Sequence, residues 1–327
     1  MANPRHWDVS RGPHLAEVVF RNDLSPEQAL DLVCTTEGEV DIVTEVPPAE
    51  AARVEASKHA KLVSIDAIRA IIGVIDRDTD GLPFGDLRVR QALNRAVDLH
   101  GLIADAMHGH ARPLARLTPR SGALGLELIT PPLFSPYPHD PERSAELWRE
   151  AGGEGSRPIR IAAWGKPEAV ARRVAADIHE ALGIGTEMTV LHGREEMLEA
   201  RRRLATRESP RAWDILVLEQ GAQAADTVAT KLHRAFAGAS GEYRDGPIVP
   251  AFEEAYADLV AETARLKQSM ISHRIDKLVH DEALALFLCA PDALYAVNRH
   301  VDFTPYRSTF ELAETKVTSE HWSCTSR

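Results

Sequence analysis

Helix-like and strand-like segments alternate along almost the whole chain, and no other feature of the sequence limits the fold as much. Short apolar runs such as 159–164 are followed by segments whose apolar side chains recur every three or four positions, as on one face of a helix. One such segment follows Asp86, and another runs from Val170 to Leu182 and ends at Gly183. Strands alternating with amphipathic helices are typical of sheets covered by helices. The sequence therefore predicts an α/β protein.

Capping and turn residues mark the ends of the predicted elements. Ser25 and Asp140 are each followed by proline, which is typical of helix starts because the first residue caps the helix and proline fits its first turn. Residues 112–138 are rich in proline and glycine and predict an extended loop. The other predicted strands cover residues 17–20, 40–43, 67–75, 186–191, 214–218 and 293–297. The other predicted helices cover residues 251–268 and 270–284.

Length and charge limit the number of domains and the class of partner. A chain of 327 residues suggests about two domains. Its 38 Lys and Arg residues face 49 Asp and Glu residues, a net charge of −11 without any local basic block. Such a surface repels phosphate backbones and anionic lipids. The longest apolar run, 283–290, is far shorter than the roughly 18 residues of a membrane span. We therefore expect neither nucleic acid nor a membrane as a partner.

The first residues and the cysteines indicate the cellular compartment of the protein. The opening segment MANPRHWD lacks the basic stretch and the apolar stretch of a secretion signal. The three cysteines are widely spaced and form no Cys-x-x-Cys pair, which disfavours a disulfide framework and a zinc knuckle. From these features we expect a soluble protein of the cytoplasm.

The common short motifs of catalysis and cofactor binding are absent from the sequence. It contains no Gly-x-Gly-x-x-Gly after a strand, no phosphate-binding P-loop and no Gly-x-Ser-x-Gly turn. His108 and His110 have the spacing of two metal ligands, but no neighbouring carboxylate or cysteine completes a set. An exposed helix end is the preferred interpretation of this pair. We expect no cofactor and no metal.

Several segments, in a fixed order, resemble a known family. The most specific covers residues 83–93, with the sequence PFGDLRVRQAL, and AVD follows at 96–98. NP-x-x-W at 3–7, GEVDI at 38–42 and the helix pattern at 140–152 match further parts of the family pattern. In these segments the chain is similar to the family 5 solute-binding proteins of ABC transporters, the receptors for peptides, nickel and related ligands. The resemblance implies a two-lobe, periplasmic-binding-protein-like (type II) α/β fold, with the ligand held between the lobes.

The same resemblance implies that the first lobe is shortened. Family members are usually longer and carry an export signal, so this chain would lack the opening part of lobe I. On this basis residues 1–85 and 291–327 form a reduced lobe I, and residues 86–290 form a complete lobe II. Strand edges exposed by the shortening would favour a homodimer formed through lobe I.

The segment after Asp214 is where the sequence departs most from the family pattern. In peptide-binding members a similar strand leads to an aromatic residue, then an acid that holds the peptide amine, then an acid–proline pair. By the same spacing Gln220 takes the aromatic position, Gln223 takes that of the amine-binding acid, and Asp226 with a threonine replaces the pair. These departures argue against generic peptide binding, although Glu219 or Asp226 could still meet a ligand amine.

Further ligand-binding candidates lie at inferred strand ends and lobe connections. Trp164 ends the first strand of lobe II, where its ring could stack on a planar ligand or cover the core. Glu219 follows four apolar residues, so burial would raise its pKa and suit it to general acid or base catalysis. Pairing with an arginine, or capping the next helix, is the alternative for this carboxylate. Asp76 and Arg77 lie in the inferred lobe connection, and Tyr295 lies in the returning one.

Two functions of different classes fit these residues. The first is an enzyme of the Pictet–Spengler type in natural-product biosynthesis, which condenses an aromatic amine or amino acid with a carbonyl compound. Truncated proteins similar to this family are thought to act in this way. Trp164 would then provide the stacking surface, Asp226 would stabilise the iminium ion, and Glu219 would remove the ring proton. The second function is a non-catalytic solute-binding or peptide-binding protein, or a sensor. The missing export signal and the changed peptide-binding positions favour the enzyme.

Overall fold

The chain divides into two compact units. The computed structural model describes residues 14–117, 135–206, 212–221, 233–238, 241, 243–244, 246–306 and 310–325. The small unit comprises Met1–Ala67 and Asp292–Arg327, and the large unit comprises Ile68–Pro291. The first break therefore lies earlier than the expected boundary between residues 85 and 86. Strand pairing and apolar packing hold residues 68–85 within the large unit.

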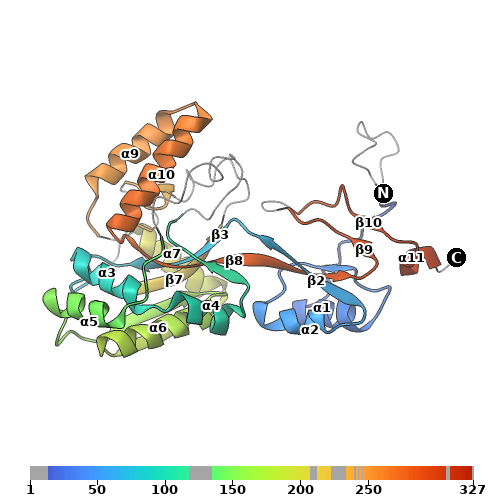
Figure 1. Ribbon diagram of the computed structural model, residues 1–327, viewed down its shortest axis with the longest axis horizontal. Coiled ribbons are helices and arrows are strands. Elements are labelled where there is room, and N and C mark those ends of the chain that lie inside the picture. The colour runs from blue at the N-terminus through green and yellow to red at the C-terminus, as the bar shows by residue number, and fades with distance from the viewer. Residues whose placement is uncertain are drawn as a thin grey trace. The chain divides into compact units, whose positions relative to one another are not determined.

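A mixed sheet lies at the centre of the large unit (Figure 1). Its strands follow the order β8-β3-β7-β5-β6, so β5 lies between β7 and β6. β5 runs parallel to both of these neighbours, whereas β3 pairs antiparallel with β7 and with β8. The strands are β3 (Arg69–Ile75), β4 (Ala111–Pro113), β5 (Ile159–Trp164), β6 (Thr186–Leu191), β7 (Ile215–Gly221) and the first part of β8 (Ala285–Asn298).

Helices cover both faces of this sheet, as the alternation of the sequence predicts. Strand residues point alternately to two apolar clusters, with Ile161 and Val217 in the first and Ala162 and Leu216 in the second. The first cluster lies under α3 (Leu87–Ala96), α4 (Leu99–Met107), α5 (Pro141–Glu150) and α6 (Glu168–Leu182). The second lies under α7 (Gly193–Thr206), α9 (Pro250–Ala261) and α10 (Arg265–Asp281).

The capping residues of the sequence start the helices where expected. The side chain of Asp86 accepts an N–H of the first turn of α3, and that of Asp140 does the same for α5. Asn94, buried within α3, then ties the helix to the sheet. Its amide donates to the Ala285 carbonyl and its oxygen accepts the Phe287 N–H. Asn94, directly after the family-like segment 83–93, therefore ties α3 to β8.

The small unit packs helices against a short antiparallel sheet. The second part of β8 pairs with two strands, with Val63 opposite Tyr295 and Ile42 opposite Val297. Ser25 and Gln28 form the capping box that begins its first helix, as the Ser-Pro pair predicts. The elements are α1 (Pro26–Thr35), β1 (Ile42–Val43), η1 (Pro48–Glu50), α2 (Ala51–Glu55), β2 (Ala60–Asp66), β9 (Val301–Asp302), β10 (Lys316–Val317) and α11 (Trp322–Thr325).

Several local predictions were wrong or incomplete. Residues 17–20 form no strand, and the Phe20 side chain is 75% exposed, because none of the described strands pairs with this run. Helix α7 and strand β4 were not predicted. The sequence of α7 is mostly charged and shows little helical periodicity, so it did not predict a helix. Most of the predicted loop 112–138 lies outside the described residues.

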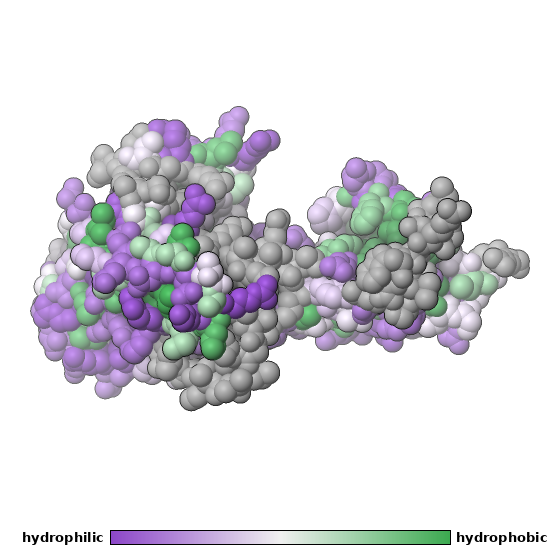
Figure 2. Space-filling model, turned by 90° about the horizontal axis from the view of Figure 1, so that it is seen from above, coloured by the Kyte–Doolittle hydropathy of each residue, from purple (hydrophilic) through white to green (hydrophobic). Residues whose placement is uncertain are grey.

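One described face of the large unit is mainly hydrophilic. Figure 2 shows charged and polar residues over much of this face, with apolar residues scattered among them. This agrees with the excess of acidic residues in the composition. Within the described ranges, no helix combines the length and the apolar character needed to cross a membrane.

Candidate functional site

The carboxyl ends of the parallel strands meet at one rim of the large unit's sheet. From β5 the chain continues to β6 on one side, whereas from β7 it continues to β8 on the other side. Adjacent strands from which the chain departs in opposite directions form a topological switch point, where open α/β sheets usually bind ligands. We call this the carboxyl-end rim. It comprises Trp164 at the end of β5, and Glu219 and Gln220 at the end of β7.

Trp164 and Gln220 lie on the same face of the sheet. Trp164 is opposite Leu218 in the register of the two strands, and Gln220 follows Leu218 by two positions. Trp164 and Leu218 both pack against the second apolar cluster, which places all three side chains on that face. Trp164 is half-buried, so it covers the core on one side and keeps part of its ring exposed.

The Gln220 amide is buried without a hydrogen-bond partner. The residue is only 7% exposed, and its Nε2 finds no acceptor in the part of the chain that the structure describes. A buried N–H group without an acceptor costs about 1–3 kcal/mol, so such groups are rare in native proteins. An acceptor supplied by a ligand would remove this cost.

Glu219 occupies the opposite face of the sheet. Its Oε1 lies 3.4 Å from Nη1 of Arg69, so the ion pair that the sequence left as an alternative is formed. In the register both Glu219 and Cys289 lie opposite Ile71. Burial raises the pKa of the Cys289 thiol to about 12, and the Glu219 charge adds to the rise. The thiol is therefore protonated at neutral pH, which suits packing and not nucleophilic chemistry.

The expected catalytic trio is not assembled by the described residues. Trp164 and Glu219 lie on opposite faces of the sheet, and Glu219 is paired with Arg69. Gln223 and Asp226 lie outside the described residues.

Asp76 and Arg77 lie at the other rim of the sheet. They follow β3, whose last residue Ile75 pairs with Ile215 at the start of β7. The Asp76 N–H donates to the Asp214 carbonyl. A strand of this length separates them from the carboxyl-end rim by roughly 20 Å. They are not in a connection between the units, because the chain passes from one unit to the other at 67/68 and 291/292.

Tyr295 belongs to the core of the small unit. It is 8% exposed, and its ring centroid lies 5.2 Å from that of Phe303 and 6.5 Å from that of Phe310. The bulk of the ring therefore serves packing. The structure places Tyr295 in a different unit from Trp164 and Gln220.

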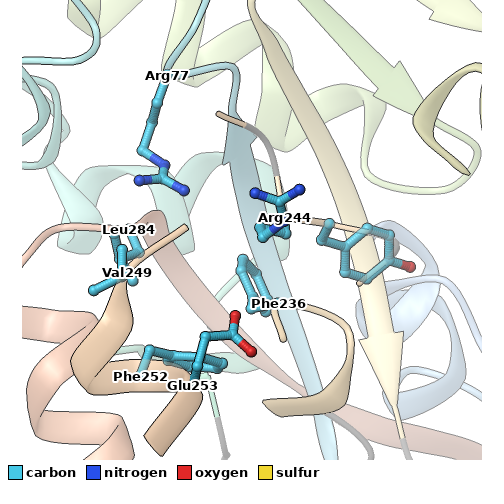
Figure 3. Close-up of a pocket in the computed structure, with 8 residues that line it drawn as sticks. Arg77, Phe236, Arg244, Val249, Phe252, Glu253 and Leu284 are labelled. Carbon is cyan, nitrogen blue, oxygen red and sulfur yellow. The ribbon is translucent and has the colours of Figure 1, made fainter. Parts of the chain in front are cut away.

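A small pocket lies at the rim where β5 and β7 begin (Figure 3). We call this the amino-end rim. Of its lining residues, the sequence analysis named Arg77 alone as a candidate; Arg244 was missed because it lies in an irregular segment without periodicity or motif. A second arginine within reach of Arg77 would have required knowledge of the fold. The pocket is lined by Arg77, Phe236, Tyr243, Arg244, Val249, Phe252, Glu253 and Leu284.

The histidine pair lies at the end of helix α4. His108 ends α4 in the left-handed conformation, as expected of a helix end. Among the residues whose placement is described, no three His, Cys, Asp or Glu side chains are grouped so that they could hold a metal ion.

Comparison with known proteins identifies the family. The family model of the bacterial extracellular solute-binding proteins, family 5 (middle), matches residues 1–229. The glutathione-binding protein GsiB of Escherichia coli O1:K1 is 30% identical over 115 residues, which is 35% of this chain and 21% of GsiB. GsiB of Salmonella typhimurium matches to the same extent. The aligned part is therefore a minor share of these relatives.

Solved structures with a similar fold come from the same group of proteins. NikA from Brucella suis, solved with Fe(III)-EDTA, has a TM-score of 0.71 at 19% identity, over 90% of this chain and 60% of NikA. DppA from Helicobacter pylori, solved with the peptide STSA, has a TM-score of 0.68 at 16% identity, over 86% and 53%. The chain thus spans little more than half of these proteins. The likeness confirms the expected α/β fold of the type II periplasmic-binding proteins.

These findings correct the expected activity. The prediction of a Pictet–Spengler enzyme is wrong, because the matching family is one of solute-binding proteins and the relative GsiB is a glutathione-binding protein. The departures from the family pattern after Asp214 do not by themselves indicate catalysis. The family model covers more than half of the chain. The chain belongs to the bacterial extracellular solute-binding proteins, family 5.

Proposed function

We propose that the chain is a non-catalytic binding protein for a small peptide-like solute, and that the carboxyl-end rim supplies ligand contacts. The observation that carries this proposal is the Gln220 amide, a buried donor at the switch point of the sheet for which the described residues supply no acceptor. Peptides offer carbonyl and carboxylate oxygens, which are the acceptors that such a donor lacks. Binding would therefore recover the free energy that the empty site loses.

Two further features of the rim suit a peptide-like ligand. Trp164 offers an aromatic surface on the same face as Gln220, against which an apolar side chain or a peptide plane can pack. Glu219 and Arg69 present a carboxylate and a guanidinium on the other face, both partly exposed. A zwitterionic solute carries the complementary charges and can replace this internal pair by pairs of its own.

Two of the named proteins, GsiB and DppA, agree with this ligand class. GsiB is a glutathione-binding protein, and DppA was solved with the peptide STSA as an ABC transporter-associated binding protein. Glutathione is itself a tripeptide. We assign solute capture for transport or sensing as the step that this chain performs, with the ligand returned unchanged.

Calorimetric titration tests the proposal. Glutathione and a set of dipeptides and tripeptides are titrated separately into the wild-type protein and into Gln220→Leu. We expect at least one of them to bind the wild type, and Gln220→Leu to weaken that binding about tenfold or more, because the ligand oxygen loses its donor. Mass spectrometry of the recovered ligand should find it unchanged.

Gln268→Leu is the matched control. This glutamine lies on α10, and its Nε2 already donates to the Glu262 carbonyl, 2.6 Å away. The control should bind the ligand as the wild type does. Equal affinity of Gln220→Leu and the wild type, or a covalently altered ligand, would contradict the proposal.

A further inference from the structure

The C-terminal segment of the small unit brings together a serine, a histidine and an aspartate. Helix α11 lies next to the C-terminus of the chain (Figure 1), and His321 directly precedes it. Ser323 is a residue of this helix, whereas Asp41 lies in the segment just before β1. Asp41 and His321 are 280 positions apart in the sequence. Their contact therefore depends on the fold, and no sequence motif predicts it.

Two hydrogen bonds join the three side chains in a row. The Ser323 hydroxyl lies 2.8 Å from Nδ1 of His321, and Nε2 of His321 lies 3.1 Å from Oδ1 of Asp41. The Ser323 backbone N–H also donates to Nδ1, over 3.3 Å. Because Nδ1 accepts from these donors, the hydrogen of the neutral imidazole is assigned to Nε2, which donates it to Asp41. This tautomer leaves a basic nitrogen beside the serine hydroxyl.

The neighbours of Asp41 fix the position of its carboxylate. Its Oδ1 also accepts from Nε1 of Trp322 at 3.0 Å and from Nδ2 of Asn298 at 3.2 Å. The Asn298 backbone N–H donates to the Asp41 carbonyl at 2.8 Å. The Trp322 ring lies beside Gly38, where a Cβ would be 3.8 Å from the ring. The carboxylate is therefore held between β8 and α11, facing His321.

Exposure differs among the three residues in the way that a reactive serine requires. His321 is only 2% exposed and Asp41 is partly exposed, whereas Ser323 is exposed. Most of the imidazole is therefore shielded from water, while a reagent can reach the hydroxyl. His321 also caps the first turn of α11, but for that role the backbone N–H of Ser323 is sufficient. Capping alone requires neither the contact with the hydroxyl nor the contact with Asp41.

We propose that Ser323 is a modification site that takes an acyl group from an activated ester, with His321 as the base and Asp41 as the residue that positions it. The serine oxygen bonds to the carbonyl carbon of the ester while Nδ1 of His321 accepts the hydroxyl proton. The Asp41 carboxylate stabilises the imidazolium that forms. The bond from the carbonyl carbon to the leaving oxygen then breaks, and this oxygen takes the proton from Nδ1. The products are the Ser323 ester and the free alcohol.

The acyl donor must carry a good leaving group. α11 is a single turn of four residues, so its amino end provides little stabilisation for an oxyanion. The reaction modifies the protein itself and leaves the proposed solute unaltered. Its three residues belong to the small unit, whereas Trp164 and Gln220 belong to the large unit.

Acetylation of the wild-type protein by 4-nitrophenyl acetate tests the proposal. Intact-protein mass spectrometry counts the acetyl groups over time, and peptide mapping locates them. Ser25 is the matched control, because it is also exposed but its Oγ accepts the Gln28 N–H in the cap of α1. We expect Ser323 to be acetylated about tenfold or more faster than Ser25, because a base takes the proton of its hydroxyl. Equal rates at the two serines would overturn the proposal, and this comparison needs no variant.

Variants identify the base and the nucleophile. His321→Gln should slow acetylation of Ser323 about tenfold or more, whereas His300→Gln should not, because His300 pairs with Glu37 and Glu320. Cys324→Ala should leave the rate at Ser323 unchanged, although the neighbouring thiol is exposed. An unchanged rate in His321→Gln would overturn the proposal. Loss of the Ser323 ester in Cys324→Ala would also overturn it, because the thiol would then be the group that meets the reagent.

Asp41→Asn tests the positioning residue. It should slow acetylation of Ser323 about tenfold or more, because a neutral amide does not stabilise the imidazolium, and Asp41→Glu should recover part of the rate because it keeps the charge. Circular dichroism checks that each variant is folded, and folded Asp41→Asn replaces His321→Gln as the test if the latter does not fold. A wild-type rate in folded Asp41→Asn would contradict the assigned role of the carboxylate.

Discussion

The buried polar side chains at the two ends of strand β7 differ in their hydrogen bonding. Asp214, immediately before the strand, is completely buried, and its carboxylate accepts hydrogen bonds from Thr79 and from the side chains of Arg157 and Arg160. Gln220, at the other end, is nearly as buried, yet its amide nitrogen has no partner among the described residues. At Asp214 the chain itself supplies the hydrogen-bond donors, whereas at Gln220 the described residues supply no acceptor.

This difference separates stability from function within a single strand. Burial opposes ionisation of Asp214, but the bonds from Arg157 and Arg160 outweigh it and hold the pKa of the carboxyl well below its usual range. The amino-end rim therefore contributes to the free energy of unfolding through this charge cluster. At the carboxyl-end rim, by contrast, the unpaired Gln220 amide lowers the free energy of unfolding. Natural proteins keep such buried unpaired groups mainly at functional sites, where a ligand can supply the missing partner.

Removing the satisfied group should have the largest effect. Asp214→Ala leaves Arg157 and Arg160 without their shared acceptor and leaves a void at the start of β7. We expect a loss of about 3 kcal/mol in the free energy of unfolding, measured by urea denaturation. A loss below about 1 kcal/mol would show that solvent around the two arginines replaces the carboxylate.

The contribution of Asp214 should also depend on pH in a defined direction. Because its pKa is lower in the folded protein than the usual 3.8, the unfolded chain binds the proton more readily at low pH. The stabilisation is complete above pH values near 3.8 and is lost as the pH falls towards the lowered pKa. The difference in unfolding free energy between the wild type and Asp214→Ala should therefore shrink below about pH 4. A constant difference between pH 7 and pH 3 would contradict this assignment.

The charge pair at the carboxyl-end rim should contribute least to stability. Glu219 and Arg69 are both partly exposed, and pairs of this kind contribute about 1 kcal/mol or less. Glu219→Gln should therefore change the free energy of unfolding by less than about 1 kcal/mol. A loss as large as that of Asp214→Ala would mean that both rims serve stability alike, and the contrast between them would fail.

The sequence predicted many of the helices and strands but not the assembly of the site. Asp86 and Asp140 begin α3 and α5 as predicted, because a helix cap acts on its own first turn. The strand expected at 17–20 is absent, because a strand depends on partners that its own residues do not specify. α7 was missed because its apolar residues are too few to show a helical face.

The site shows the same limit. Alternation along β7 already requires Glu219 and Gln220 to point to opposite faces, but only the pairing of β5 with β7 shows which of them shares a face with Trp164. Asp76 and Arg77 were assigned to a lobe connection because the boundary was expected after residue 85. That the Gln220 amide lacks an acceptor among the described residues cannot be predicted from the sequence, because it depends on which groups surround the side chain. Roles for Gln223 and Asp226, the homodimer and the cytoplasmic location stay predictions.

The most direct test of the central claim measures Gln220→Leu in two ways. Leucine has nearly the same size and removes the unpaired donor, so urea denaturation without ligand should find the variant about 1 kcal/mol more stable than the wild type. Calorimetry should find peptide binding weakened about tenfold or more by the same change. A variant that is more stable but binds less would establish that Gln220 is kept for a ligand. A variant that is less stable and binds equally well would show that the amide serves the fold, and the account would be wrong.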